Sequence, residues 1–478
     1  MLQFALVKAN PSPGLDSILD PKLLIEDLER LDDLIRKAHV APFTYCTEEE
    51  YIEALNVAKA NASTGLTYYE FTAEVGLFLQ VLEDSHTSLN LSALAAVYKE
   101  NDGLFMNFSL LSTGEHEHFI KEDRYGLLPT GSELLEINEV PFDSVYHKSF
   151  KMSLREGKST EGFLAIADAI SVPMAGVWQE IKKSNTVLVK LPSGEKKEIH
   201  YPGKLYDEWK DWNKKNYERK ELYELIYLTD SVAHMRIQTF AGSKANKYNK
   251  FINRSFKDLK KKDVPQLILD LRHNTGGKAN RMEYLYNHLT DVQSRLPDNI
   301  IAKQSETARK LHAKSYKGLN RFILTKLLKN NEDAQNYVKI VSLADSEVDT
   351  VYYNEPPAQV KFPYAGKCTL LIDGLSGSAS VNLAAGFRLA KIGEIYGQPC
   401  LGPITGTWGN PAPESLTNSG INIFISTIRF NSNRLFETSD VAIFPDVLVI
   451  PNPSMMAEGK DTVIERVLEE LNKKRNTP

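Results

Sequence analysis

Residues 368–411, CTLLIDGLSGSASVNLAAGFRLAKIGEIYGQPCLGPITGTWGNP, form the stretch that decides the fold. An apolar run at 369–373 predicts a buried strand, small residues at 374–379 predict a tight turn, and 380–391 is typical of a helix. A serine at such a turn exposes its hydroxyl group, and the helix N-terminus directs backbone N–H groups toward a developing oxyanion. The same turn also suits anion binding or a purely structural role.

A second segment, LILDLRHNTGG at residues 267–277, favours the catalytic interpretation. Its apolar start, interrupted by one acid, predicts a strand that is buried on both faces. The strand leads into a polar loop that ends in Gly276 and Gly277, and paired glycines allow positive φ and close approach of the backbone to a ligand. Two strand ends, one with a serine turn and one with a glycine loop, together suit an acyl-transfer site.

These residues resemble motifs of the C-terminal-processing (tail-specific) and tricorn-core serine peptidase family. DLRHNTGG resembles the DLRxNxGG element of that family, and GLSGSASVNLAAGF resembles its nucleophile turn, which places the nucleophile at Ser378. Three further segments match in the same order along the chain: LEDSHT at 82–87 an Asp-x-His-Thr element, LPTGSELLEINEVP at 128–141 the core of a PDZ-like domain, and AIFPDVLV at 442–449 the closing strand. The resemblance covers about residues 20–475.

The general base separates two branches of this family. The processing branch uses a lysine in a Gly-Lys turn, and the matching turn here, at 401–403, has proline in that position. No lysine occurs between residues 392 and 459. The tricorn-like branch uses a histidine preceded by a serine, and Ser85-His86 matches that pair. The resemblance therefore implies Ser–His rather than Ser–Lys chemistry.

The resemblance implies a role for each site residue. Ser378 Oγ would attack the scissile carbonyl, while His86 would take its proton and return it to the leaving amine. Ser85 and Glu437 would orient the histidine; the spacing of Glu437 to the last strand is longer than the family pattern, so Asp440 is an alternative. The oxyanion hole would be built from the backbone N–H groups of Ala379 and of Gly276 or Gly277.

Other residues near these motifs have simpler interpretations. Ser376 and Ser380 are rival nucleophiles in the same turn. His273 lies beside the glycine loop, where a structural role is favoured. His116 and His118 alternate as in a strand and lack the i, i+4 helical spacing of zinc peptidases, so we predict no metal site. No cofactor is predicted either.

The expected fold class is a multidomain α/β and α+β protein with three regions. Residues 1–102 predict a helical region that carries the base just after its third helix. Residues 103–204 predict short strands, and the resemblance implies an embedded PDZ-like domain that recruits a substrate C-terminus or only gates the site. Its carboxylate-binding loop would correspond loosely to residues 125–128. Residues 205–478 predict a catalytic α/β domain, which the resemblance makes a crotonase-like core.

An insertion at about residues 281–360 interrupts the catalytic region. It predicts a basic helical stretch at 319–329 and an acidic loop around 333–349. Such an insertion would either lie over the cleft and limit substrate size or be a surface elaboration remote from the chemistry.

Composition narrows the classes of function. Of the 478 residues, 42% are hydrophobic and 25% are charged, which is ordinary for a globular protein. The net charge of −5 gives no general basic surface for nucleic acid, and no apolar run reaches the length of a membrane span. The three cysteines are far apart and exclude a disulfide scaffold, but they leave a single bridge open.

We therefore expect a serine peptidase that acts on peptides or unfolded proteins through an acyl-enzyme. Two alternatives remain: a catalytically silent protein that binds peptides or apolar ligands, and a non-peptidase acyl hydrolase. The N-terminus as given lacks the pattern of a signal peptide, but the resemblance implies an extracytoplasmic location, in the bacterial periplasm or cell envelope. The oligomeric state and the natural substrate are left open.

Overall fold

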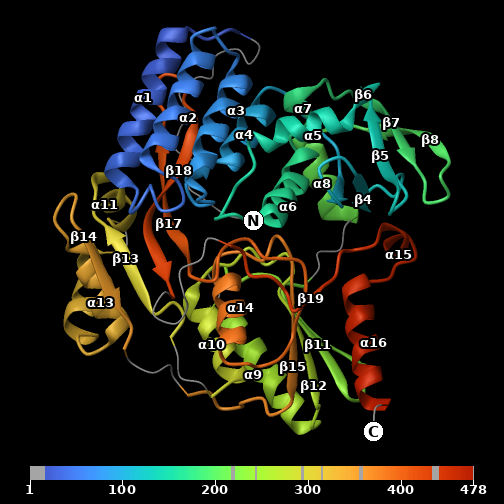
Figure 1. Ribbon diagram of the computed structural model, residues 1–478, viewed down its shortest axis with the longest axis vertical. Coiled ribbons are helices and arrows are strands. Elements are labelled where there is room, and N and C mark those ends of the chain that lie inside the picture. The colour runs from blue at the N-terminus through green and yellow to red at the C-terminus, as the bar shows by residue number, and fades with distance from the viewer. Residues whose placement is uncertain are drawn as a thin grey trace.

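The structure is a computed structural model that describes residues 17–216, 221–242, 245–291, 295–313, 316–354, 359–432 and 441–476. It is a mixed α/β architecture in which a parallel sheet, a helical region and a strand-rich module lie against one another (Figure 1).

Six strands form the sheet that carries the serine turn. Strands β11, β12, β15, β16 and β19 run parallel, and β10 pairs antiparallel with β11 at one edge. Strands β12 and β15 are neighbours, with Asp270 paired to Leu371, so the loops that follow them leave the same edge of the sheet. The sheet order is β10 (Tyr223–Thr229), β11 (Val232–Ile237), β12 (Gln266–Asp270), β15 (Lys367–Ile372), β16 (Ile395–Gly397) and β19 (Val447–Leu448).

Helices cover both faces of this sheet, as a parallel sheet requires. Helices α9 (Ala245–Lys261), α10 (Ala279–Leu289) and α14 (Ala379–Leu389) share one apolar core with the sheet. Helix α16 (Thr462–Asn476) packs Val463 and Val467 against the opposite face (Figure 1). Strand β12 is buried along its whole length, as its apolar sequence predicts.

The N-terminal region is helical, with bounds set by clear capping signals. Asp20 accepts a hydrogen bond from the Lys22 N–H, and Pro21 opens the first helix, as the sequence predicts. The helices are α1 (Pro21–Ala38), α2 (Glu48–Ala62), α3 (Tyr68–Leu79) and α4 (Leu91–Glu100), with a short 3₁₀ turn, η1 (Gln80–Leu82), after α3.

These helices share their core with a second sheet rather than forming a separate unit. Leu416, Ile423 and Ile425 from the C-terminal part of the chain are buried among the helices. The sheet follows the order β1 (Ser88–Leu89), β18 (Asn422–Asn431), β13 (Asn299–Lys303), β14 (Val348–Tyr352), and β17 (Gly406–Ser415) also pairs with β18.

Strands and helices between residues 103 and 204 form a module with its own core. The predicted hairpin is present as the pair β7 and β8. The short pair β2 (Leu104–Phe105) and β9 (Lys204–Leu205) closes the module, and α8 (Tyr206–Asn216) follows. Its other elements are β3 (Phe108–Ser112), β4 (His118–Asp123), β5 (Glu133–Ile137), β6 (Val140–Pro141), α5 (Phe142–Phe150), α6 (Thr160–Ser171), α7 (Ala175–Trp178), β7 (Ser184–Lys190) and β8 (Lys196–Pro202).

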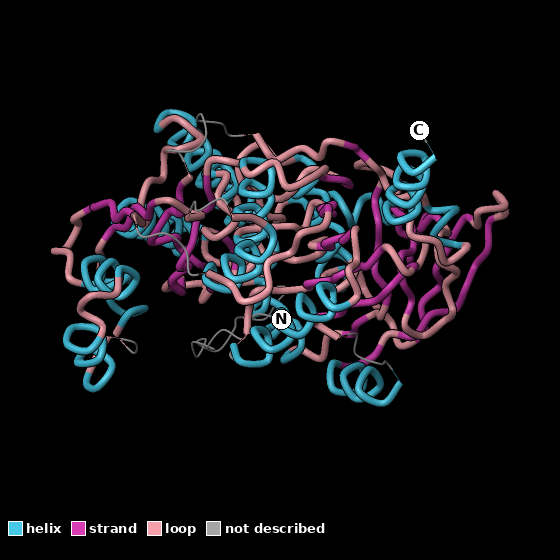
Figure 2. Tube along the Cα trace, turned by 90° about the horizontal axis from the view of Figure 1, so that it is seen from below, coloured by secondary structure: helices cyan, strands magenta, loops and turns pink. Residues whose placement is uncertain are grey.

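The predicted insertion is built into the second sheet. Strand β13 pairs with β18 on one side and with β14 on the other, at the end of the molecule opposite α16 (Figures 1 and 2). The predicted acidic loop at 333–349 is wrong in its first half, because Asn331 caps a helix, α13 (Glu332–Val341). The predicted start at 281 is also too early, because α10 belongs to the core. The remaining elements are α11 (Glu306–His312), α12 (Gly318–Phe322), η2 (Ile323–Leu327) and α15 (Pro453–Ala457).

Cys46, Cys368 and Cys400 are free thiols. Among the described residues, none of the helices has the length and apolar character needed to cross a membrane.

Candidate active site

Ser378 lies at the N-terminus of α14, directly after the turn that follows β15. Its backbone has φ 50° and ψ −116°, a left-handed value of φ that a serine rarely adopts. The rival serines are both fully buried and hydrogen-bonded: Ser376 Oγ donates to the Leu271 carbonyl at 2.9 Å, and Ser380 Oγ donates to the Asn274 carbonyl at 2.8 Å. Ser378 is partly exposed, so of the three it alone presents its hydroxyl to a ligand.

Asn274 joins the glycine loop to the serine turn. Its side-chain amide donates to the Ile237 carbonyl at 2.9 Å, and its backbone carbonyl accepts the Gly377 N–H at 3.1 Å. Gly276, with φ 97°, lies so close to the turn that a Cβ atom there would be 2.7 Å from Ser378 Cβ. Only glycine therefore fits, which is the physical reason for the glycine at this position of the motif.

The two glycine amides face different partners. The Gly276 N–H already donates to Asn274 Oδ1 at 2.9 Å. Gly277 pairs with Phe240 in a parallel bridge, in which the Gly276 carbonyl and the Lys278 N–H make the hydrogen bonds to Phe240. The Gly277 N–H points away from Phe240 as a result. Ala379 begins α14, where the first N–H groups have no partner within the helix.

His86 lies in a loop that Asp84 holds in shape. Asp84 Oδ1 accepts the His86 N–H at 2.8 Å, and Oδ2 accepts from Thr87 Oγ1 at 2.6 Å and contacts His39 Nε2 at 2.9 Å. The Ala41 N–H donates to His39 Nδ1, which fixes the proton of that imidazole on Nε2. Thr87 Oγ1 also accepts the Ser426 N–H at 2.9 Å, so the loop is attached to β18.

A carboxylate that no sequence motif marks, Glu156, completes the surroundings of His86. Glu156 Oε2 accepts the Ser85 N–H at 3.1 Å, accepts a short hydrogen bond from Ser85 Oγ, and lies 3.4 Å from His86 Nδ1. Ser85 Oγ is 3.2 Å from the same His86 nitrogen. These contacts occupy Nδ1 of a side chain that is 21% exposed, and among the described residues Nε2 has no hydrogen bond.

The turn at Leu401 and Gly402 connects this cluster to the serine turn. Leu401 pairs with Gly377, the residue before Ser378, and its N–H donates to the Ser376 carbonyl at 3.0 Å. A Cβ atom on Gly402 would lie 3.1 Å from Glu156 Cγ and 3.5 Å from a methyl group of Val381 on α14. Gly402 thus lies between Glu156, which holds Ser85 and His86, and Val381 in the first turn of α14.

Electrostatics prepare His86 to accept a proton. Burial by itself lowers the pKa of His86, but the hydrogen bond with Glu156 and the charges of Glu156 and Asp84 outweigh it and raise the pKa above its ordinary value. The imidazole is therefore held against a carboxylate that stabilises its protonated form.

The two acids named from the sequence, Glu437 and Asp440, lie outside the described residues. Asp446, from the same closing motif, has a structural contact: its carboxylate accepts the Ile395 N–H at 2.8 Å and joins β19 to β16.

His273 links the glycine loop to the module at 103–204. Its Nδ1 lies 2.5 Å from Asp373 Oδ2, and its Nε2 lies 2.9 Å from Lys121 Nζ on β4. The carboxylate fixes the imidazole with its proton on Nδ1, so that Nε2 accepts from the lysine. These contacts agree with the structural role that the sequence favours.

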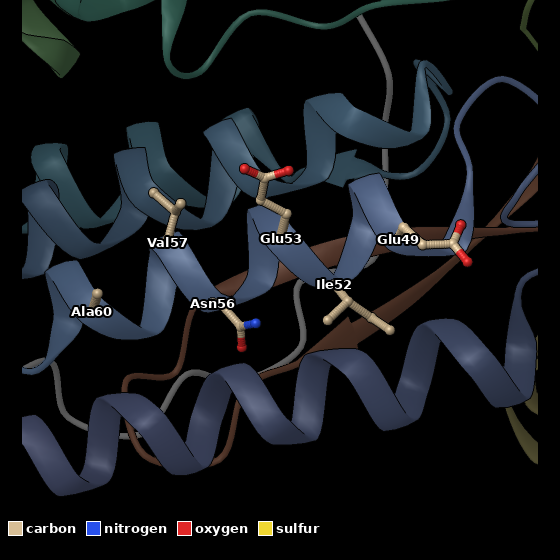
Figure 3. A pocket seen from close by; sticks show the side chains of 6 residues that line it. All are labelled: Glu49, Ile52, Glu53, Asn56, Val57 and Ala60. Carbon is tan, nitrogen blue, oxygen red and sulfur yellow. The ribbon is translucent and has the colours of Figure 1, made fainter.

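Two groups of described residues offer ligand atoms within 4.8 Å of one another that could hold a metal ion: Asp84, His86 and Glu156 at this site, and Glu115, His116 and His147 elsewhere. A separate surface hollow lies along α2 and contains none of the site residues; it is lined by Glu49, Ile52, Glu53, Asn56, Val57 and Ala60 (Figure 3).

Comparisons with known proteins concern the family and the fold of the chain. The family model of peptidase family S41 matches residues 231–449, from β11 to the end of the closing motif. Among solved structures, mature CPAF has a TM-score of 0.63 and 14% sequence identity over 91% of this chain and 94% of its own. A CPAF mutant gives a TM-score of 0.65 and 14% identity over 92% and 94% of the two chains. These likenesses show a shared fold. A search of curated protein sequences gave no match.

Proposed function

Because residues 231–449 belong to peptidase family S41, we propose that this serine peptidase hydrolyses peptide bonds through an acyl-enzyme formed on Ser378. The observation that supports the proposal is that Glu156, which holds Ser85 and His86, lies beside Gly402, the residue after the one that pairs with Gly377. A histidine with one nitrogen held by a carboxylate and the other free is the arrangement that a serine nucleophile needs.

In the first step Ser378 Oγ attacks the scissile carbonyl carbon, and His86 Nε2 takes the hydroxyl proton. Glu156, directly and through Ser85, fixes the imidazole and stabilises the imidazolium that forms. We assign to Glu156 the orienting role that the resemblance implies for Glu437 or Asp440.

The tetrahedral intermediate places a negative charge on the former carbonyl oxygen. We assign the oxyanion donors to Ala379 N–H and Gly277 N–H, because Asn274 already accepts the Gly276 N–H. Each such donor contributes about 2.7–4 kcal/mol to transition-state stabilisation. The C–N bond then breaks as His86 returns its proton to the leaving amine, and a water molecule activated by His86 hydrolyses the ester on Ser378.

The finer architecture also belongs to this proposal. The parallel sheet of residues 221–476, with helices on both faces, supports a crotonase-like core. The separate apolar core of residues 103–204 supports an embedded PDZ-like domain. The helical region at residues 1–102 carries the base, His86, in a loop after its third helix. The resemblance supports an extracytoplasmic location, in the bacterial periplasm or cell envelope.

Labelling with a fluorophosphonate probe tests the catalytic assignment. We expect the probe to modify Ser378, located by mass spectrometry, and Ser378→Ala and His86→Ala to abolish both labelling and peptide turnover while the circular dichroism spectrum is unchanged. His200→Ala is the matched control, because His200 is exposed on β8 and should leave labelling intact. Full turnover in folded Ser378→Ala or His86→Ala would refute the mechanism. A folded wild type that resists the probe and cleaves no peptide would favour the binding-protein alternative.

A further inference from the structure

Three histidines converge on one carboxylate in the module at 103–204, away from the proposed active site. Asp143, in the first turn of α5, has its Oδ1 atom 3.1 Å from His116 Nδ1, 3.4 Å from His118 Nε2 and 3.3 Å from His147 Nδ1. His118 is on β4, His147 is one helical turn after Asp143, and His116 precedes β4. The rings of His116 and His147 stack with their centres 5.0 Å apart.

We propose that His116, His118, His147 and Asp143 bind a divalent transition metal ion such as Zn²⁺. Imidazole nitrogen and carboxylate oxygen are the donors such ions prefer, at bond lengths of about 2.0–2.2 Å. Ligand atoms at the corners of a tetrahedron with such bonds are about 3.3–3.6 Å apart. The three nitrogen–oxygen distances around Asp143 are close to that spacing.

The surroundings of His118 are those of a metal ligand. Its side chain is 1% exposed, and its Nδ1 is 2.9 Å from Ser112 Oγ, which in turn donates to Asp168 Oδ1 at 2.5 Å. Asp168 is also fixed by the Tyr146 hydroxyl at 2.8 Å and by the Ser112 N–H at 2.8 Å. This chain of hydrogen bonds turns Nε2 of His118 toward Asp143, as outer-shell partners do at metal sites.

His147 needs the largest adjustment. Its Nδ1 lies 2.8 Å from the backbone carbonyl of Asp143, and binding through that nitrogen exchanges this hydrogen bond for the metal. Glu115, which is exposed, has a ligand atom within 4.8 Å of ligand atoms of both His116 and His147 and could serve as a further ligand. From the sequence we predicted no metal here, because His116 and His118 alternate as in a strand and lack the helical spacing of zinc peptidases. Asp143 and His147 are distant in the sequence and reach them only through the packing of α5.

Titration of the full-length protein with Co²⁺ tests the site. After treatment with EDTA and dialysis, one equivalent of Co²⁺ should give the visible absorption of a tetrahedral ion, and Zn²⁺ should displace it. His116→Gln and Asp143→Asn should weaken binding by at least about tenfold. Both residues are exposed at the surface, with side-chain exposures of 72% and 44%, so both variants should fold.

Two controls separate this site from other histidines. His200→Gln, outside the cluster, should bind as the wild type does. His86→Gln should also retain the absorption, because His86 belongs to a different group of ligand atoms, with Asp84 and Glu156 at the proposed active site. Wild type that binds no Co²⁺ at millimolar concentration, or binding that is unchanged in both His116→Gln and Asp143→Asn, would overturn the proposal.

Discussion

Glu156 gives the active site a carboxylate from outside the S41-matched segment. It binds the backbone and hydroxyl of Ser85, and its other oxygen accepts the Trp408 N–H at 3.1 Å. The carboxylate is almost fully buried, with a side-chain exposure of 1%. Because all its hydrogen bonds are to groups around His86 or to the second sheet, its position is fixed before substrate arrives, as an orienting group requires.

Glu156→Gln should shift the pH dependence of catalysis. His86 acts as a base only when neutral, and its raised pKa places the acidic limb of kcat/KM above the ordinary imidazole value of about 6.5. Removing the carboxylate lowers the pKa of His86, so the acidic limb should move to lower pH, with a smaller maximal rate. The measurement is kcat/KM for a peptide substrate from pH 5 to pH 9.

Glu139→Gln is the matched control, because Glu139 is an exposed glutamate in the turn between β5 and β6 and should leave the profile unchanged. A profile for Glu156→Gln that keeps the wild-type limb would show that Glu156 does not interact with the base.

At this scale the sequence predicts some contacts well and others not at all. Ser378 and Gly276 come from short local motifs, and the structure places them in contact through the paired ends of β12 and β15. Glu156 could not be predicted, because 71 residues separate it from Ser85 and no local pattern marks a carboxylate in a loop.

At the scale of elements, the loop at 84–87 depends on Asp84. Burial by itself raises the pKa of Asp84, but the hydrogen bond and charge of His39 and the charge of His86 lower it overall. Asp84→Asn should destabilise the protein by about 2 kcal/mol, because the asparagine NH₂ group would face an N–H or O–H donor where Asp84 has an acceptor oxygen. The His39 Nε2–H is one such donor, since the Ala41 N–H keeps the proton of His39 on Nε2. A thermal melt at pH 7 measures this as a lower Tm.

The same change has a defined pH dependence. A carboxyl group with a lowered folded pKa stabilises the fold above its unfolded pKa of about 3.9 and loses that contribution as pH falls through the folded pKa. The difference in Tm between wild type and Asp84→Asn should therefore be largest near neutral pH and shrink below pH 4. Asp33→Asn, in an exposed ion pair on α1, should change Tm little at any pH. A constant difference across the range would contradict the assignment.

A second element, the loop at 125–128, already holds an internal carboxylate. Asp123 Oδ2 accepts the Leu127 N–H at 2.7 Å and the Leu128 N–H at 2.8 Å, and Oδ1 accepts the Tyr125 N–H at 3.0 Å and a hydrogen bond from the Tyr201 hydroxyl at 2.6 Å. These backbone N–H groups are the ones that a peptide C-terminus would need. The geometry favours a module that gates the site over one that recruits free C-termini.

Paired substrates test this distinction. Peptides of one sequence with free and with amidated C-termini should be cleaved with the same kcat/KM by the wild-type enzyme. A strong preference for the free carboxylate, lost on deletion of residues 103–204 in a variant that still cleaves the amidated peptide, would show recruitment instead.

Element boundaries were predictable where local chemistry determines them. Asp20 and Pro21 mark the start of α1, and the Thr47–Glu50 capping box marks the start of α2, each within a few adjacent residues. The region at 299–352 was not predictable, because β13 becomes a strand by pairing with β18, far along the chain at 422–431, and β14 in turn pairs with β13. An acidic stretch that is capped by Asn331 and packed against β14 forms a helix where charge by itself suggested a loop.

At the scale of the whole molecule, the helical region shares one apolar core with the hairpin of β17 and β18. Leu416, Ile423 and Ile425 lie in the core of the helices, and β1 pairs with β18. Residues 103–478 without the first 102 would expose this apolar surface, so the domain boundaries predicted from the sequence are not limits of independent folding units. The same hairpin holds the base loop through Ser426 and Glu156 through Trp408.

Asp27 on α1 offers a single point at which to test this coupling. Its side chain is fully buried, and its two oxygens accept the Asn418 N–H at 2.8 Å and the Ser419 N–H at 2.7 Å in the turn between β17 and β18. Asp27→Ala leaves both N–H groups without these acceptors and should cost about 2 kcal/mol. Because the turn belongs to the shared core, the variant should unfold in one cooperative transition at a lower Tm. The loss of activity on heating should follow the same curve.

Lys22→Ala, at an exposed position on the same helix, should melt as the wild type does. Two separate transitions in Asp27→Ala, with activity lost only in one, would show that the helical region and the catalytic sheet unfold independently.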